Sequence, residues 1–280
     1  MQDFHFQPFE PDPPLDLVLT QTFYARGRIP YRSDKILPTG LIPVLFNLGN
    51  PHRLGKAADP ESNPSFAHGW VDGFQTTPTY HTPTDGTHVI GLLFEPVGFH
   101  ALFDVDMATL RDRTVDAREI MPAAFVTAIE NHYEQAGDDV THRTFHELVR
   151  GWPRQSLPDW LWALYREIRD RRGDVVLKDR YTSIDRSPRQ ITARFKRAIG
   201  VTPKKLCRIH RLLALLEAVD PAGPVNWTEL AHSFDFHDQA HFNHEFRALS
   251  GLYPSEYLSQ RRGEYPDLEQ GEHVVFAPQN

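Results

Sequence analysis

Short apolar runs separated by turn residues fill the first 120 or so residues of the chain. Three of these runs are LDLVLTQTFYA, GLIPVLFNLG and THVIGLLFEPVGF, and LPTG, LGNP and TDGT lie between them. Strands of a few residues bounded by Gly, Pro and Asn are typical of a sandwich or a barrel. Residues 1–120 are therefore predicted to form a β-rich, barrel-like domain, with a helix over residues 99–112 packed on the sheet.

From about residue 121 the apolar positions recur at helical spacing. The segments MPAAFVTAIENHYEQA, DVTHRTFHELVRGW and DWLWALYREIRDRRGD each show this period. Pro153 and Pro158 separate the second segment from the third. The predicted fold class is α+β, with residues 121–158 as a helical connector, 159–262 as an all-α domain, and 263–280 as a loosely ordered polar tail.

One motif of the all-α part occurs twice. The stretch SPRQITARFKRAIGVTPKKL at 187–206 has Phe195, Gly200 and Pro203, and HDQAHFNHEFRALSGLYPSEYL at 237–258 repeats them as Phe246, Gly251 and Pro254. Each pair is 51 residues apart. Two copies are too few for a solenoid, so the sequence predicts a duplicated supersecondary unit.

Each copy has the start and stop signals of a helix. Ser187 is a favourable N-cap before Pro188, Asp238 occupies the same place in the second copy, and a glycine ends each helix. In the second copy the shorter helix WTELAHSF precedes a tight turn, which gives the helix-turn-helix pattern. KKLCRIHRLLALLEAV is apolar enough to be a helix that links the two units.

The charge distribution favours nucleic acid as the partner. The formal net charge is −7, yet residues 175–262 hold 14 Lys and Arg against 9 Asp and Glu, about +5, which leaves −7 − 5 = −12 elsewhere. A charge run is more often only a solvated helix face, but here it coincides with the repeated unit. On a helical wheel, the face opposite the apolar stripe carries Arg189, Gln190, Ala193, Lys196 and Arg197 in the first copy, and His237, Ala240, His244 and Arg247 in the second.

Several other classes of protein lack support in the sequence. There is one cysteine, Cys207, in an amphipathic segment where a small helix-lining residue is expected, and no apolar run of membrane-spanning length. The N-terminus is acidic and proline-rich, unlike a signal peptide, so a cytoplasmic location without membrane association is expected. No catalytic or phosphate-binding motif occurs, and no cofactor or metal is predicted. The alternatives left open are a cupin-like metal-dependent enzyme or an adaptor, either with an accessory nucleic-acid-binding helical domain.

The repeated segments resemble the DNA-binding domain of the AraC/XylS family of transcription regulators. The resemblance covers roughly residues 160–260 and is carried by SPRQITARFKRAIGVTPKKL, RLLALLEAV and LAHSFDFHDQAHFNHEFRALSGLYPSEYL. It implies a non-enzymatic, sequence-specific regulator, expected to be an activator, whose two recognition helices enter successive major grooves of double-stranded DNA. The base-facing positions that it implies are Arg189, Thr192, Ala193 and the adjacent Gln190 in the first helix, and Gln239, Ala240, His241 and His244 in the second. Lys196 and Arg197 are expected on phosphates.

The chain departs from the family pattern at two places. Asp235 stands where the second turn usually has glycine, and aspartate tolerates a left-handed backbone better than most residues. Leu230 and Ala231 correspond to Asp179 and Arg180 in the first copy, so the first helix there is expected to shift to VVLKDRY with a longer turn.

The N-terminal half resembles an uncharacterised β-rich domain found on a subset of these regulators. It is expected to sense a small molecule or a partner. Candidate residues for an effector pocket are Trp70, Phe74, Tyr80, His81 and Phe94, although these aromatics are more often plain core residues. Further expected partners are RNA polymerase and a second copy of the chain, with the helices at 121–172 as either a dimer interface or an internal packing seam.

Overall fold

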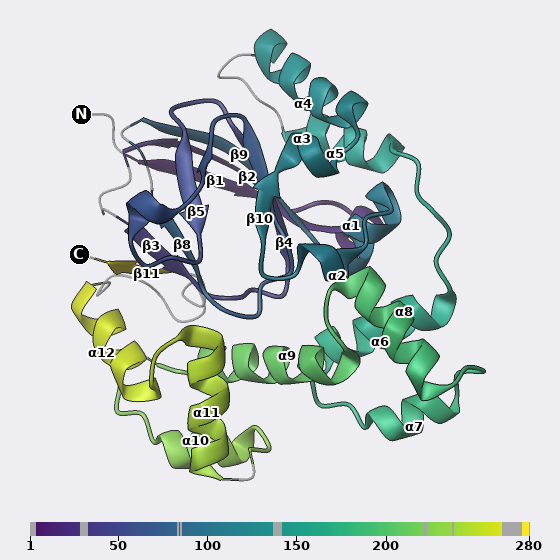
Figure 1. Cartoon of the computed structure of the whole chain (residues 1–280), viewed down its shortest axis with the longest axis vertical. Coiled ribbons are helices and arrows are strands. Elements are labelled where there is room, and N and C mark those ends of the chain that lie inside the picture. Colours follow the sequence, from purple (N-terminus) through teal and green to yellow (C-terminus); the bar gives the residue numbers. More distant parts are fainter. Residues whose placement is uncertain are drawn as a thin grey trace.

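The computed structural model describes residues 4–28, 33–82, 84, 86–136, 142–220, 223–236, 238–264 and 276–279. Strands dominate the first 116 residues and helices the rest, which confirms the predicted α+β class. In Figure 1 the strands form one body, and the green and yellow helices pass along one end of it.

The strands form two antiparallel sheets. The first has the order β1 (His5–Phe9), β2 (Leu19–Gly27), β9 (Thr87–Phe94), β4 (Ile42–Asn47), β7 (Gly69–Asp72) and β10 (Thr114–Asp116). The second has the order β11 (Phe276–Gln279), β3 (Ser33–Ile36), β8 (Thr79–Thr82), β5 (His52–Gly55) and β6 (Ser65–Phe66). The barrel-like part of the prediction is wrong, because the described strands form two open sheets. Closure depends on pairing between strands distant in sequence, which local patterns do not encode.

The six-stranded sheet is buried on both faces. Val44, Ile90 and Leu92 belong to the main core that they share with the helices, whereas Val89 and Trp70 pack in a smaller core with residues of the second sheet. Alternate residues of one strand thus lie in different cores, as the period of two requires.

Helices cover one side of this sheet. They are α1 (Pro96–Phe103), α2 (Met107–Leu110), α3 (Ala117–Ile120), α4 (Ala123–Ala136) and α5 (His142–Gly151), with a 3-10 turn at Leu15–Leu17. A second 3-10 turn, Pro60–Ser62, lies beside β5 and β8 of the second sheet. The single helix predicted over 99–112 is in fact two. Asp104 ends α1 in the left-handed region at φ 50°, and the Asp106 side chain caps α2 by accepting from Ala108 N.

The remaining helices are α6 (Asp159–Asp170), α7 (Leu177–Thr182), α8 (Pro188–Ile199), α9 (Pro203–Glu217), α10 (Trp227–Ser233), α11 (Gln239–Ser250) and α12 (Pro254–Glu264). One continuous core runs from the six-stranded sheet through α6, α8 and α9 to Phe242 and Phe246 of α11.

The C-terminal strand β11 joins the second sheet. Phe276–Gln279 pairs antiparallel with β3, with Phe276 opposite Ile36. This strand differs from the loosely ordered tail expected for 263–280; residues 265–275 of that tail lie outside the described residues. The domain boundaries at 120, 158 and 262 stay predictions.

Candidate nucleic-acid interface

The two helix-turn-helix units have the same register. Helices α8 and α11 begin at 188 and 239 and end at 199 and 250, and α7 and α10 end at 182 and 233, so each pair differs by 51 residues. The segments between the helices, residues 183–187 and 234–238, are therefore equal in length. The expected longer turn in the first unit is wrong, because α7 spans Leu177–Thr182 instead of ending at 181 and matches α10 despite its polar sequence.

Side chains of the predicted types cap both recognition helices. The Ser187 hydroxyl accepts from Gln190 N at 3.3 Å, and the Gln190 side-chain oxygen accepts from Ser187 N at 3.0 Å, forming a capping box. In α11 the Asp238 carboxylate accepts from His241 N at 2.7 Å. Gly200 and Gly251 end the helices at φ 98° and 72°. Asp235 is left-handed at φ 57°, as its place in the turn predicts.

The first recognition helix presents a basic face. Arg189, Gln190, Ala193 and Arg197 are exposed, and Thr192 and Lys196 are half-buried. The side chain of Thr192 hydrogen-bonds Tyr181 of α7, and the oxygen of Gln190 is engaged in the cap.

Arg194 and Arg197 extend this face. Arg194 is also exposed, which sequence reasoning missed although the same helical wheel places it beside Gln190 and Arg197. Arg197 lies 3.9 Å from the Asp104 carboxylate of the N-terminal half, and both side chains remain mostly exposed.

The second recognition helix presents a face that is polar and rich in histidine. Gln239, Ala240, His241, His244 and Arg247 are exposed, and His237 lies outside the described residues. Arg247 is held in place: its Nη1 donates to the Tyr253 hydroxyl at 2.7 Å, and its guanidinium carbon lies 4.7 Å from the centre of that ring. The role of Tyr253 was not predicted, because it depends on the chain folding back after Gly251.

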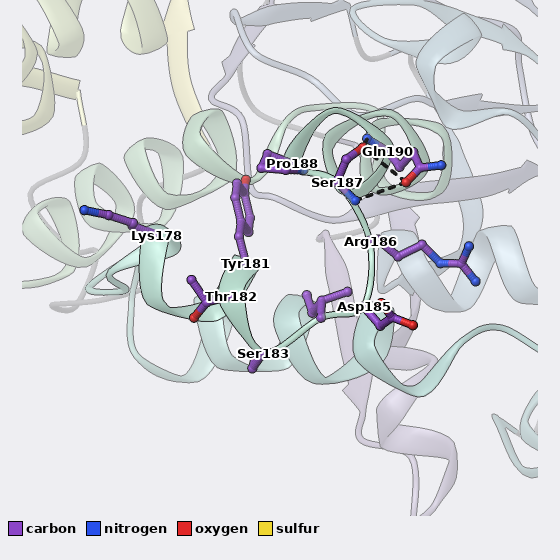
Figure 2. Close-up of a pocket in the computed structure, with 10 residues that line it drawn as sticks. Lys178, Tyr181, Thr182, Ser183, Asp185, Arg186, Ser187, Pro188 and Gln190 are labelled. Atoms are coloured by element: carbon purple, nitrogen blue, oxygen red, sulfur yellow. Dashed lines mark hydrogen bonds between the residues drawn. The ribbon is translucent and has the colours of Figure 1, made fainter.

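An open groove of about 910 Å³ separates the end of α7 from the start of α8. Figure 2 shows the residues around it, with the dashed bonds of the capping box at its rim. Its lining combines two cations with several hydroxyl groups, and Lys178 and Arg186 were not among the predicted contacts. The lining residues are Lys178, Tyr181, Thr182, Ser183, Ile184, Asp185, Arg186, Ser187, Pro188 and Gln190.

The linker helix α9 is bound to both units. Leu206, Ile209 and Leu212 lie in the main core with the apolar residues of α8. Arg208 pairs through two hydrogen bonds with Glu245, a buried carboxylate of α11. Cys207 is buried, and burial raises the pKa of its thiol to about 11, so the thiol stays protonated near neutral pH.

The five candidate effector-pocket residues do not surround one space. Trp70 packs in the core between the sheets, whereas Phe74 and Phe94 lie in the main core on the helix side. His81 Nε2 lies 2.9 Å from Nδ1 of His52, and Tyr80 is half-buried. Among the described residues, no three His, Cys, Asp or Glu side chains gather as a metal site.

These features define a DNA-binding protein with two helix-turn-helix units joined by one linker helix. Residues 182–260 match the family model described as helix-turn-helix domain, and residues 7–116 match the domain of unknown function DUF6597. The chain therefore carries an AraC-type helix-turn-helix domain behind a DUF6597 domain. Among the described residues, no helix is both long and apolar enough to cross a bilayer.

The comparison with curated proteins gives no match. Among solved structures, the chain is similar to ToxT from Vibrio cholerae in its P21 crystal form, with 11% identity, 92% of this chain and 98% of that chain covered, and a TM-score of 0.41. Unsaturated fatty acid-bound wild-type ToxT from Vibrio cholerae has 12% identity and a TM-score of 0.38, with 92% of this chain and 97% of that chain covered. The AraC-like transcriptional activator CuxR has 12% identity and a TM-score of 0.27, with 79% of this chain and 82% of that chain covered.

Proposed function

We propose that the protein binds double-stranded DNA at specific sequences, with α8 and α11 reading two successive stretches of the major groove. One observation carries the proposal: two capped helices in identical register, each with an exposed polar face, are joined by one buried linker helix. A recognition helix reads base edges from its exposed face, and successive major-groove segments lie about 34 Å apart.

The two helices have different roles in this proposal. In α8, Arg189, Thr192 and Ala193 face base edges, while Lys196 and Arg197 contact phosphates. The groove beside α8 adds Lys178 and Arg186 as phosphate contacts. Because these side chains are cationic and lie within one unit, the first unit contributes most of the electrostatic affinity.

In the second unit, base readout is expected to dominate. Gln239, Ala240, His241 and His244 face the groove, with His237 beside them in the sequence. Alanines at 193 and 240 suit the methyl group of thymine, which needs only apolar contact. Arg247, stacked on Tyr253, is placed to contact a phosphate.

Regulation through the N-terminal half is part of the proposal. The buried Glu95, which precedes α1, accepts from Arg169 of α6 at 2.8 Å and also hydrogen-bonds Tyr165. Thr20 of β2 donates to the same carboxylate. A small-molecule effector or a partner would act by favouring one arrangement of this contact, since only differential binding shifts an equilibrium.

RNA polymerase and a second copy of the chain remain proposed partners. The apolar faces of α4 and α5 are used inside the molecule, where Phe125, Ile129 and Phe145 are buried in the main core. That packing favours an internal seam over a dimer interface at these helices.

Selection of DNA from a random pool by the full-length protein, at two salt concentrations, tests the proposal. Two enriched blocks about one helical turn apart are expected. A single block would refute base reading by one of the helices. Weak binding without enrichment, lost at the higher salt concentration, would refute sequence-specific recognition altogether.

A further inference from the structure

Both recognition helices end against the same loop of the N-terminal half. Residues 73–78 join β7 to β8. At the end of α8, a β-carbon added to Gly200 would lie 2.9 Å from Cβ of Phe74, near the start of this loop. At the end of α11, a β-carbon added to Gly251 would lie 3.0 Å from Nζ of Lys35 on β3 and 3.8 Å from Cγ of Pro78, at the end of the loop. Equivalent positions of the two units, 51 residues apart, thus lie beside opposite ends of one six-residue segment.

The lysine that follows β5 holds this loop in shape. Lys56 Nζ donates to the carbonyl oxygens of Thr77 at 2.9 Å and Pro78 at 3.1 Å, and to the Thr79 hydroxyl at 3.2 Å. It also donates to the side-chain oxygen of Gln75. Four acceptors on or beside one loop are therefore gathered by a single ammonium group.

Two carboxylates fix the rest of the loop. Asp72, which is buried, accepts from Gln75 Nε2 at 2.7 Å. Asp112 accepts from Thr76 N at 2.7 Å. Gly73 packs so closely on α2 that an added β-carbon would lie 1.9 Å from the carbonyl oxygen of Leu110. The loop is consequently braced along its length.

The covalent connection between the units leaves room for such a brace to act. Residues 218–226 separate α9 from α10 without forming helix or strand in their described part. Arg208 and Glu245 join α11 to α9, and Phe242 and Phe246 of α11 share the main core with residues of α9. The loop lies at the other end of the second unit's recognition helix, beside Gly251, and is therefore placed to influence the orientation of α11 relative to α8.

We propose that Lys56 is a positioning residue for DNA recognition: by bracing loop 73–78 between the ends of α8 and α11, it sets the spacing at which the protein accepts two half-sites. This inference rests on the proposed function. It assigns the N-terminal half a specificity role in the absence of any effector, because the brace is made of residues of the chain itself.

A library in which the two selected half-sites are separated by different numbers of base pairs tests the inference with the full-length protein. Wild type is expected to prefer one spacing. Lys56→Met should reduce that preference over a one-base-pair change by roughly threefold or more, while affinity for each single half-site is unchanged. Arg53→Met is the matched control, since Arg53 lies on β5 and binds the carbonyl oxygen of Asn63 instead of the loop.

A second variant covers the case in which Lys56→Met fails to fold. One glycine inserted between Thr76 and Thr77 lengthens the brace and should change the preferred spacing. Unchanged spacing profiles in the folded variants would overturn the brace but leave the proposed function standing. Failure of the wild-type protein to select any site would overturn both.

Discussion

An ion pair joins the linker helix to the second recognition helix, and replacing its arginine should destabilise the protein more than replacing its glutamate. Arg208 Nε donates to Glu245 Oε2 at 2.6 Å, and Arg208 Nη2 donates to Oε1 of the same carboxylate. The Glu245 side chain is only 8% exposed, whereas that of Arg208 is 41% exposed. Water can therefore hydrate Arg208 when Glu245 is replaced, but it can hardly reach Glu245 when Arg208 is replaced.

The magnitudes follow from this asymmetry. Removing one member of a fully buried pair costs about 3–5 kcal/mol, because the other charge is left buried and unpaired. Since Arg208 is partly hydrated already, we expect Arg208→Met to destabilise the protein by about 2–3 kcal/mol. Glu245→Gln keeps an acceptor and leaves an arginine that can hydrate, so about 1 kcal/mol is expected. The double variant with Met at both positions should recover most of the loss, because an apolar pair carries no desolvation cost.

Denaturant unfolding of the full-length single and double variants measures these differences. The effect on function is measured as the affinity of each variant for DNA that carries only one half-site. Because the pair joins α11 to α9, Arg208→Met should weaken binding to the second half-site and leave the first unaffected.

Two results would refute the reasoning. Equal losses for Arg208→Met and Glu245→Gln would mean that the difference in burial does not matter. A double variant as unstable as Arg208→Met would mean that removing the unpaired carboxylate restores no stability. Arg208 would then stabilise the fold through contacts other than its pair with Glu245.

Three further predictions concern single side chains. Arg189→Ala should reduce the DNA-binding free energy by roughly 1–3 kcal/mol and relax specificity at one base pair. Lys196→Ala should instead weaken binding to all sequences alike and lower the salt dependence of binding by about one ion. Uniform losses of binding in both variants would contradict the assigned roles. Burial raises the pKa of Asp72 from 3.8 to about 6, so the folded state holds this proton more tightly than the unfolded one, and stability should fall by up to about 3 kcal/mol as the pH rises from about 4 to about 6. Asp72→Asn should remove that part of the slope in urea unfolding followed against pH; an unchanged slope would exclude Asp72 as its source. Tyr253→Leu should weaken second half-site binding by about 0.5–1 kcal/mol in a filter-binding assay, and should have no effect once Arg247 is replaced by alanine.

Local chemistry made the helical half of the fold predictable. Helix starts and stops depend on residues within one turn of the boundary, so Ser187, Asp238 and the two glycines located α8 and α11 correctly. The break between α1 and α2 was missed because aspartate at 104 does not signal a left-handed residue as plainly as glycine would.

For the β-rich half, the sequence predicted the presence of strands but not their arrangement. Its two open sheets, and the pairing of Phe276–Gln279 with β3, depend on partners far away in sequence. For the same reason the aromatic residues proposed for one pocket lie on different sides of the six-stranded sheet. The exposed faces of the recognition helices followed from the 3.6-residue period, whereas the contact of Arg247 with Tyr253 and the brace at Lys56 are tertiary.

The uneven charge and the two unlike recognition helices lead to one account of how DNA approaches. The region 175–262 carries about +5 and the remainder about −12, so we expect most of the surface to repel DNA and the helix-turn-helix side to attract it. Within that side, residues 187–211 hold eight basic residues and no acidic one, whereas α11 contributes a single arginine and a buried glutamate. The first unit should therefore capture DNA and account for most of the salt dependence. The second unit, held at a set distance by the linker and the loop, should then decide whether the captured sequence is the correct one.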